Sequence, residues 1–336
     1  MKAVGVLESK PISAAGSLLD VEMPDPLLRP DDLLVEIEAI SVNPADAKRR
    51  MGIAPDQVPQ EPIVLGYDAV GIVRDVGPNV VGFSKGDRVW YAGDVSRAGS
   101  YAERQAVDHR IASLAPAQVS PVAAASLPLV SLTAWEMLFD RLQVPVTGYS
   151  DTLLVIGGAG GVGSVTQQLA RKLTGLHVIA TASRPETVEW CLKMGAHETV
   201  DHKNLVKTVQ ALGHSTVRFI VQYADTAQHW DAMCELVEPQ GRIGTIVETQ
   251  ENLDISALQA KSAALMWELM FTRSLFGTPD MARQGQILSR VARLVDDGVV
   301  RTTEQKVLKG LSADTLKEAH RIIETGQMIG KLVIEY

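Results

Sequence analysis

A glycine-rich stretch, TLLVIGGAGGVGSVTQQLARKL at residues 152–173, constrains the fold more than any other part of the chain. An apolar run of strand character ends at its glycines, and a helical pattern begins directly after them. Gly158, Gly160 and Gly163 form the pattern G-x-G-x-x-G at this turn. In such a turn the first glycine permits a tight bend, the second lets the backbone approach a pyrophosphate, and the third allows close helix-to-strand packing.

The helix after this turn would present unpaired N–H groups and the positive end of its dipole to phosphate groups. A glycine-rich turn that only packs tightly and binds nothing is the alternative interpretation. The strand before the glycines and the helix after them favour the phosphate site. We therefore predict a dinucleotide site that includes Gly158, Gly160, Gly161, Val162 and Gly163.

The end of the next predicted strand, in VIATASRPET at residues 178–187, indicates which dinucleotide binds. An acidic residue there would accept from the ribose 2′-OH of NAD, whereas neutral or cationic donors suit the 2′-phosphate of NADP. The strand ends at Ser183 and Arg184, and a guanidinium makes charge-assisted hydrogen bonds to phosphate. Arg184 as a solvated surface arginine is the alternative, and we expect Glu186 on the next helix to point away. The sequence predicts NADPH as the cofactor.

The strand-then-helix pattern continues on the carboxyl side of the glycines, through HVIATAS, ETVEWCLKMG, FIVQYAD and HWDAMCELVE. This alternation is typical of a parallel sheet with crossover helices. Before residue 126 the chain instead has β-branched runs broken by Gly, Pro and Asp, such as DLLVEIEAISV and IVLGYDAVGIVRDVG, which predict a compact β unit. A length of 336 residues agrees with about two domains.

Composition excludes several classes of partner. The chain has 32 basic and 40 acidic residues, and the basic residues are scattered, so we predict no nucleic-acid or membrane partner. Its two cysteines, Cys191 and Cys234, have no metal-like spacing, and we expect two free buried thiols in a reducing compartment. The amino-terminal residues do not form a signal peptide, and no apolar run is long enough to span a bilayer. We expect a soluble cytoplasmic protein.

With these motifs in view, the chain resembles the medium-chain dehydrogenase/reductase family, in its zinc-independent quinone oxidoreductase branch. The resemblance runs through PIVLGYDAVGIVRDVGPNVVGFSKGDRVW, GSYAERQAVD, LPLVSLTAWEML, VIGGAGGVGSVTQQLAR and IGKLVIEY. It extends to a bacterial subgroup usually labelled zinc-binding alcohol dehydrogenase family proteins, through QHWDAMCELVEPQGRIGTIVE and FTRSLFGTPDM. This resemblance implies an α/β fold with a GroES-like catalytic domain at residues 1–125 and 275–336. Residues 126–274 would form a Rossmann domain with a doubly wound parallel sheet, and the protein would be a homodimer.

The subgroup's label raises the question of zinc. In the zinc enzymes the stretch that corresponds to VLGYDAVGIV, residues 64–73, reads G-H-E and its histidine binds the catalytic zinc, whereas this chain has Tyr67. Asn43 stands where those enzymes have the first cysteine ligand, and VWYAGDVSRAGSYAE lacks the four cysteines of a structural zinc site. The histidines show no metal-binding spacing and are interpreted as isolated polar residues: His109, His177, His197, His202, His214, His229 and His320. We predict no metal.

Without zinc, a simple ketone or aldehyde lacks a Lewis acid, so a quinone or a conjugated carbonyl is the easier acceptor for hydride. If Tyr67 occupies the place of the zinc ligand, its O–H faces the acceptor, and Tyr91 is a second candidate. An aromatic wall with a structural hydroxyl is an equally good interpretation of both tyrosines. None of the six tyrosines has lysine four residues later, so the Tyr-x-x-x-Lys mechanism is excluded.

The resemblance implies further contacts to the cofactor. Asn43 of VNP and Thr133 of LTAWE would position the nicotinamide, although a turn-forming Asn and a helix-interior Thr are the plain alternatives. His202 falls where relatives have a tyrosine near the adenosine phosphate. Tyr223 ends an apolar strand at the edge where open α/β sheets bind ligands. Lys331 would reach the cofactor or lie solvated at the surface.

We expect the segments at residues 49–59 and 270–281 to shape the acceptor pocket. The leading hypothesis is an NADPH-dependent reductase of a small quinone or α,β-unsaturated carbonyl, with Tyr67 and Asn43 as the catalytic candidates. The first alternative is a zinc alcohol dehydrogenase, as the subgroup's label suggests. The second is an NADPH-binding protein without significant turnover, like the lens crystallins of this family. The sequence does not separate the leading hypothesis from the second alternative, because both keep the cofactor site.

Overall fold

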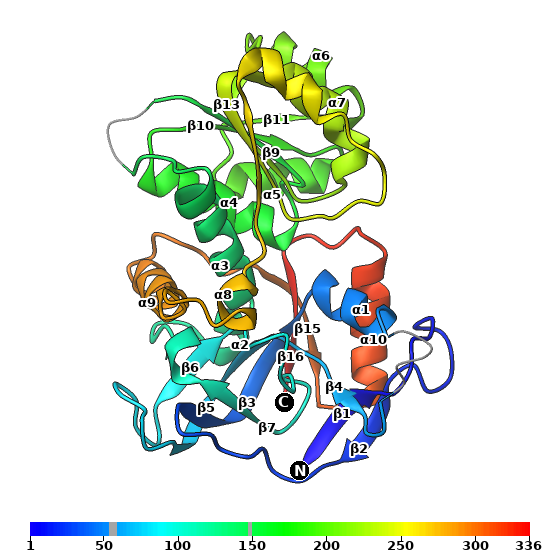
Figure 1. The fold of residues 1–336 in the computed structure, drawn as a ribbon, viewed down its shortest axis with the longest axis vertical. Helices are drawn as coiled ribbons and strands as arrows, with labels where there is room; N and C mark the ends of the chain where they lie inside the picture. The colour runs from blue at the N-terminus through cyan, green and yellow to red at the C-terminus, as the bar shows by residue number, and fades with distance from the viewer. Residues whose placement is uncertain (54–58, 147–149) are drawn as a thin grey trace. The chain divides into compact units, whose positions relative to one another are not determined.

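The structure is a computed structural model that describes residues 1–53, 59–146 and 150–336. The chain divides into two compact units. Unit 1 is Met1–Leu129 together with Phe271–Tyr336, and unit 2 is Val130–Met270. Both ends of the chain therefore belong to unit 1, as the blue and red ends of the ribbon show (Figure 1). Among the described helices, none has the length and apolar character needed to cross a membrane.

Unit 2 contains a six-stranded parallel sheet with the order β11-β10-β9-β12-β13-β14. The first strand of the unit, β9, lies in the middle of the sheet, and β10 and β11 follow on one side of it. The chain then returns to the middle and adds β12, β13 and β14 on the other side. Such doubly wound sheets bind ligands at the carboxyl ends of the strands, where the order reverses, here between β9 and β12. The strands are β9 Thr152–Ile156, β10 His177–Thr181, β11 Glu198–Val200, β12 Val217–Gln222, β13 Val237–Thr245 and β14 Ala264–Trp267.

Helices cover this sheet because each turns an apolar face toward it. In α7 the buried side chains include Trp230 and Met233, which join a core of strand residues such as Ile220 and Ile243. The helices are α3 Pro128–Trp135, a π-helical turn Glu136–Arg141, α4 Gly161–Leu173, α5 Pro185–Met194, α6 Leu205–Ala211 and α7 Thr226–Leu236, with 3-10 turns at His202–Asn204 and Ile255–Lys261.

Unit 1 is built from two sheets. The larger has the order β15-β16-β3-β5-β6-β8, with β7 also paired to β3, and the smaller has the order β2-β1-β4. The strands are β1 Lys2–Val6, β2 Leu19–Glu22, β3 Asp32–Val42, β4 Ile63–Val64, β5 Asp68–Val76, β6 Arg88–Tyr91, β7 Arg104–Asp108, β8 Ala112–Leu114, β15 Glu304–Lys309 and β16 Lys331–Glu335. The helices are α1 Pro44–Met51, α2 Pro121–Ala125, α8 Thr272–Leu275, α9 Arg283–Asp296 and α10 Ala313–Glu324, with a 3-10 turn at His109–Ile111.

The central strand β3 determines where the polar residues of unit 1 meet. It pairs antiparallel with β5 in a register that sets Ser41 opposite Asp68. It also pairs antiparallel with β16, with Val42 opposite Leu332. The first residue of β5 and the first residue of β16 therefore flank the end of β3, and Asn43 follows directly as the N-cap of α1. Strand register thus brings together three segments that are far apart in the sequence.

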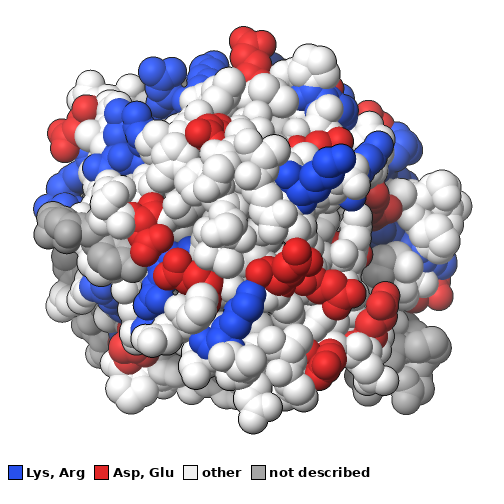
Figure 2. Space-filling view, turned by 90° about the horizontal axis from the view of Figure 1, so that it is seen from above, with Lys and Arg blue, Asp and Glu red and all other residues white. Residues whose placement is uncertain are grey.

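The architecture confirms the predicted α/β class, with a β-rich unit formed by both chain ends and a parallel-sheet unit between them. The closing strand β16 completes the large sheet of unit 1. Basic and acidic side chains are interspersed on the face that Figure 2 shows. The described residues on that face form no broad basic surface of the kind that nucleic acids require.

Candidate functional site

The glycine-rich turn after β9 is bent at a residue that the sequence motif did not single out. Gly157 has a φ of +87°, and its N–H donates to Thr181 Oγ1 at 2.9 Å. Gly158, the first glycine of the motif, instead packs against β10, because a Cβ there would lie 2.8 Å from Ala180 Cβ. The bend expected at Gly158 is therefore made one residue earlier, since only glycine adopts this backbone conformation without strain.

Gly163 has the packing role that the motif predicts, and Gly160 has open space beside it. A Cβ on Gly163 would lie 2.4 Å from the carbonyl oxygen of Gly157, so α4 can approach the strand only with glycine at this place. A Cβ on Gly160 would have only one neighbour within 4 Å, the same oxygen at 3.6 Å. The turn is thus closed at Gly163 and open at Gly160, which leaves room for a phosphate against the backbone.

The amino-terminal end of α4 is free to bind an anion. Gly160 is the N-cap and supplies no side-chain cap, and N–H groups in the first turn of a helix have no acceptor within the helix. Ser164 Oγ donates to the Gly160 carbonyl at 2.7 Å and accepts from Trp190 Nε1 at 2.8 Å. These two hydrogen bonds tie the first turn of α4 to α5. The unpaired N–H groups and the positive dipole end fit the pyrophosphate of a dinucleotide.

The corner after β10 contains a cation and an acid together. Ser183 is exposed, and the Arg184 side chain is 40% exposed. Arg184 Nε lies 3.2 Å from Glu186 Oε1. The expectation that Glu186 points away is therefore wrong, because Glu186, the second residue of α5, folds back onto Arg184. A 2′-phosphate at this corner would compete with Glu186 for the guanidinium.

The remaining predicted cofactor residues of unit 2 lie on different elements. Tyr223 follows β12, and its hydroxyl is 3.0 Å from Thr166 Oγ1 on α4, which ties it to the helix that begins at the glycine turn. Burial raises the pKa of Tyr223 above its ordinary value. His202 begins a 3-10 turn with its Nδ1 3.6 Å from Asp201 Oδ1. Thr133 is buried on α3.

A buried polar network in unit 1 joins Asn43, Asp68 and Lys331. Asp68 Oδ2 accepts from Ser41 Oγ at 2.5 Å, from Asn43 Nδ2 at 2.9 Å and from Lys331 Nζ at 3.2 Å. Its Oδ1 accepts from the Leu129 N–H at 2.6 Å. Lys331 Nζ also donates to Asn43 Oδ1. The three side chains form hydrogen bonds to one another, so the opposite charges of Asp68 and Lys331 compensate each other inside the protein.

This network changes the interpretation of Lys331. The sequence left a cofactor contact and a solvated surface position open. Lys331 is only 4% exposed, so the surface alternative is wrong. Its ammonium group binds the side chains of Asn43 and Asp68, and through Asn43 it holds a residue that the resemblance places at the nicotinamide.

Asp46 and Tyr67 form a second buried pair of titratable groups beside this network. Asp46 Oδ2 accepts from the Asn43 N–H at 2.7 Å. Burial raises the pKa of Asp46 to about 7, although the Asn43 N–H and the charge of Lys331 oppose the rise. Tyr67 is 6% exposed, and its ring centroid lies 4.6 Å from that of Phe271. Burial, and then the charge of Asp46, raise the pKa of Tyr67, so its phenol stays protonated at neutral pH.

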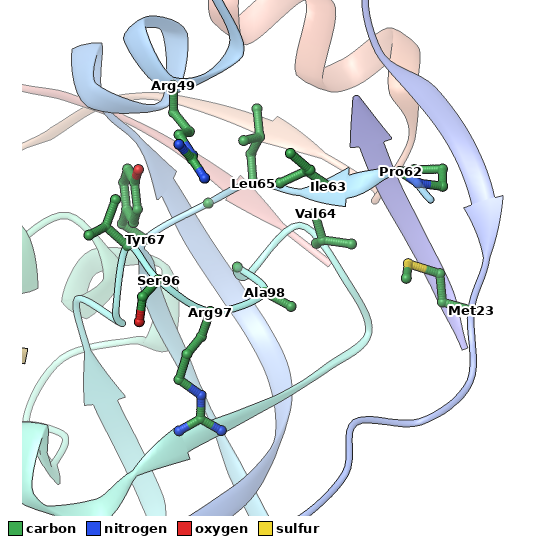
Figure 3. A pocket seen from close by; sticks show the side chains of 13 residues that line it. Met23, Arg49, Pro62, Ile63, Val64, Leu65, Tyr67, Ser96, Arg97 and Ala98 are labelled. Carbon is green, nitrogen blue, oxygen red and sulfur yellow. The ribbon is translucent and has the colours of Figure 1, made fainter. Parts of the chain in front are cut away.

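Tyr67 lines a pocket of about 290 Å³ in unit 1. Figure 3 shows the side chains of Tyr67 and Arg49 close together at one end of the pocket. Apolar side chains, among them Ile63, Val64 and Leu65, form much of the remaining wall. Tyr67, Arg49, Ser96 and Arg97 contribute the polar side chains of the pocket, and a few polar groups against an apolar wall are typical of a site for a small molecule. Arg49 belongs to the predicted pocket segment 49–59, of which residues 54–58 lie outside the described residues.

Tyr91, the second tyrosine candidate, lies in a different environment. It is fully buried in the hydrophobic core of unit 1, opposite Ala69 on the neighbouring strand. Burial raises the pKa of its phenol well above the ordinary value. This position supports a packing role for the Tyr91 ring, but its hydroxyl has no hydrogen-bond partner among the described residues, so the expected structural hydroxyl bond is not seen.

The residues at the family's catalytic zinc positions do not fit a zinc ion. The Asn43 side chain is already bonded to Asp68 and Lys331, and the ammonium of Lys331 would repel a second cation there. Tyr67 is a protonated phenol and not a ligand of the thiolate or imidazole kind. Among the described residues of unit 1, no group of three His, Cys, Asp or Glu side chains has its ligand atoms close enough to hold a metal. Both cysteines are free and buried, as predicted.

The structure assembles histidines that the sequence treats as isolated. The ring centroid of His177 lies 4.4 Å from that of His197 and 5.3 Å from that of His214. His177 begins β10, His197 directly precedes β11, and His214 stands three residues before β12. A search for polar residues at the starts of parallel strands would have detected the group, since the amino ends of such strands share one edge of the sheet.

Comparison with known proteins places the chain among the oxidoreductases. Residues 29–117 match the alcohol dehydrogenase GroES-like domain, and residues 194–334 match the zinc-binding dehydrogenase family. The chain is 42% identical to a zinc-type alcohol dehydrogenase-like protein of Staphylococcus aureus strain MRSA252, over 99% of each chain. It is 36% identical to the chloroplastic NADPH-dependent alkenal/one oxidoreductase of Arabidopsis thaliana, over 53% of this chain and 46% of that protein.

Two solved structures have the same fold. A protein from Rhizobium etli CFN 42 named for a zinc-dependent alcohol dehydrogenase is 47% identical, with a TM-score of 0.95, over 100% of this chain and 98% of that one. The quinone oxidoreductase of Coxiella burnetii is 25% identical, with a TM-score of 0.82, over 100% and 99% of the two chains. The chain belongs to the medium-chain dehydrogenase/reductase superfamily, in its quinone oxidoreductase-like branch. It is an oxidoreductase of the class that uses a nicotinamide cofactor.

Proposed function

We propose that the protein is an NADPH-dependent reductase that transfers hydride to a quinone or an α,β-unsaturated carbonyl compound without a metal. The observation that carries the proposal is the Asn43–Asp68–Lys331 network, which binds the side chain of Asn43, a residue that the resemblance assigns to the place of a zinc ligand. A conjugated acceptor needs no Lewis acid, because its own π-system delocalises the negative charge after hydride arrives. The name of the Arabidopsis relative supports the same substrate class.

The choice of NADPH over NADH rests on Ser183 and Arg184, the polar and cationic residues at the end of β10. Neither residue would repel the 2′-phosphate, and the guanidinium can bind it with charge-assisted hydrogen bonds. Glu186 accepts from Arg184 in the structure, but both side chains are well exposed, and an exposed ion pair is weak. A dianionic phosphate therefore displaces Glu186 at little cost.

In the proposed reaction, bound NADPH supplies the hydride. Gly160 and the first turn of α4 would hold the pyrophosphate. Tyr223 and His202 would bind other parts of the dinucleotide, and Asn43 and Thr133 would orient the nicotinamide ring. Tyr67 donates a hydrogen bond to the acceptor carbonyl. Solvent supplies the proton after hydride transfer, because the raised pKa of Tyr67 makes its phenol a poor acid.

We also propose that the protein is a homodimer. β14 is an edge strand of the unit 2 sheet, and Trp267 at its end is 50% exposed, which favours pairing with a second copy. Sedimentation over a range of protein concentrations tests this point. A monomer at every concentration would show that the edge stays unpaired.

The central experiment follows NADPH oxidation by the purified wild-type protein over a panel of quinones and enones. With C4-deuterated NADPH, we expect the label at the β-carbon of a reduced enone. An unlabelled product would exclude direct hydride transfer, and tight NADPH binding without any turnover would favour the non-catalytic alternative. Stoichiometric zinc bound by unit 1 residues would favour the zinc alcohol dehydrogenase.

A further inference from the structure

The amino-terminal edge of the unit 2 sheet carries a group of side chains that the proposed reaction does not use. His177 begins β10, Glu198 begins β11, and His214 lies in the connection between α6 and β12. We name these three residues the amino-edge cluster. They lie at the opposite ends of the strands from the glycine turn and from Ser183, so they are separate from the cofactor site.

The ligand atoms of the amino-edge cluster converge. One nitrogen or oxygen from each of the three residues lies within 4.8 Å of the other two, and His177 Nε2 is 3.5 Å from Glu198 Oε1. Around a tetrahedral ion with ligands at roughly 2.0 to 2.2 Å, two ligand atoms stand about 3.4 Å apart. The His177–Glu198 separation already matches that spacing, and rotation of the half-buried His214 ring can close the third side.

Two atoms of the cluster are buried without a partner. His177 Nε2 and Glu198 Oε2 are shielded from solvent, and neither has a hydrogen-bond partner among the described residues. Buried polar atoms in native proteins nearly always form hydrogen bonds, so an imidazole nitrogen and a carboxylate oxygen of one cluster that form none require an explanation. A cation between them would satisfy both atoms at once.

His197 supports the cluster without belonging to it. Its Nδ1 accepts from the Val178 N–H at 2.9 Å, which orients its ring. The ring packs against His177 with a centroid distance of 4.4 Å and so restricts the rotation of His177.

We propose that the amino-edge cluster binds one divalent transition-metal ion through His177 Nε2, the Glu198 carboxylate and the His214 ring. Two imidazoles and one carboxylate are donors that suit Zn²⁺ and its neighbours, and water completes the coordination. The ion links β10, β11 and the α6–β12 connection. Its role is to stabilise unit 2, and the proposal does not depend on the reductase activity.

The test uses the full-length protein without a histidine tag, treated with a chelator and then dialysed. Calorimetric titration with Zn²⁺ should show one saturable site per chain, and the melting temperature should rise when zinc is added. His177→Gln and Glu198→Gln should each weaken zinc binding at least tenfold and abolish the rise. The matched control Glu189→Gln, an exposed carboxylate on α5, should bind zinc like the wild type.

A wild-type protein that binds no zinc would overturn the proposal, and so would zinc binding that survives both cluster variants. If either variant fails to fold, anomalous scattering from zinc-soaked wild-type crystals decides the matter. An ion between His177, Glu198 and His214 supports the proposal, and ions only elsewhere refute it. NADPH oxidation should be the same before and after zinc is removed, which separates this site from the reaction.

Discussion

The glycine turn of unit 2 and the polar network of unit 1 form their sites in opposite ways. The turn uses neighbours within one short segment, from Gly157 to Gly163, and leaves an open space against the backbone at Gly160. The network joins side chains that are 25 to 288 residues apart and leaves none of its charges uncompensated. The turn thus has room for a phosphate group against its backbone, whereas the network holds its own side chains in position.

The largest effect should come from breaking the closed network with Lys331→Met. The buried carboxylate of Asp68 would lose its counter-ion, and removing one partner of a buried pair typically costs about 3 to 5 kcal/mol of folding free energy. Urea unfolding measures the loss. The control is Lys309→Met, whose ammonium is exposed and lies 3.2 Å from Glu335, and which should cost less than about 1 kcal/mol. Equal losses of folding free energy in the two variants would show that the buried Asp68–Lys331 pair contributes no more to stability than an exposed ion pair.

Asp46→Asn should change how stability depends on pH. Because burial raises the pKa of Asp46 from 3.8 to about 7, the folded protein holds this proton more tightly than the unfolded chain does. The wild type therefore loses stability as pH rises between these two values. The variant has no such proton to lose, so we expect its advantage over the wild type to grow with pH, by up to about 4 kcal/mol.

Unfolding free energies of both proteins at pH 5 and pH 8 measure the part of this change that falls between those two pH values, which is about 2.6 kcal/mol. Asp46 accepts from the Asn43 N–H at 2.7 Å, and an amide oxygen can accept the same bond, so the substitution preserves the local geometry. Parallel pH profiles for the two proteins would mean that Asp46 is not the group that titrates.

At the glycine turn, Gly160→Ala should weaken cofactor binding without unfolding the protein. Gly160 has a φ of −71°, which alanine adopts easily, and the new Cβ would meet only one atom, at 3.6 Å. The methyl group would occupy the space left for the pyrophosphate, so we expect NADPH affinity to fall about a hundredfold, or roughly 2.7 kcal/mol. Fluorescence titration with NADPH measures the affinity.

Gly163→Ala is the contrasting variant for this prediction. Its Cβ would lie 2.4 Å from the Gly157 oxygen, so it should lower the melting temperature as well as the affinity. Normal NADPH affinity in Gly160→Ala would show that the phosphates bind elsewhere.

Arg184→Ala should weaken NADPH binding tenfold or more, since a lost charge-assisted contact costs about 1.5 to 3 kcal/mol. NADH binding should change little, because NADH has no 2′-phosphate. Glu186→Gln should act in the opposite direction and tighten NADPH binding, because it frees the guanidinium from its partner at 3.2 Å. Equal wild-type affinities for NADH and NADPH would contradict the assignment of the cofactor.

The difference between the two regions also explains what the sequence could predict. The strand, glycines and helix at residues 152–173 are local, so their pattern predicts the fold of unit 2 and its phosphate cradle. Lys331 could not be placed, because only the register of β16 on β3 brings it to Asn43. The pairing of Glu186 with Arg184 depends on side-chain rotamers at a helix start, which sequence patterns do not specify. The amino-edge cluster depends on two strands and one connection that meet at the same edge of the sheet.

The smallest effect concerns Tyr67, which borders the closed network and faces the pocket. Burial and Asp46 raise the pKa of Tyr67, so its phenol can donate a hydrogen bond but is a poor acid near pH 7. Tyr67→Phe keeps the ring against Phe271 and removes only the hydroxyl. We therefore expect the catalytic constant to fall about tenfold, equivalent to about 1.4 kcal/mol of transition-state stabilisation, with folding stability nearly unchanged. Steady-state NADPH oxidation with an enone measures the change. A variant that folds and binds NADPH but has no measurable turnover would make the hydroxyl essential, and the proton would then have to pass through Tyr67 and not come directly from solvent.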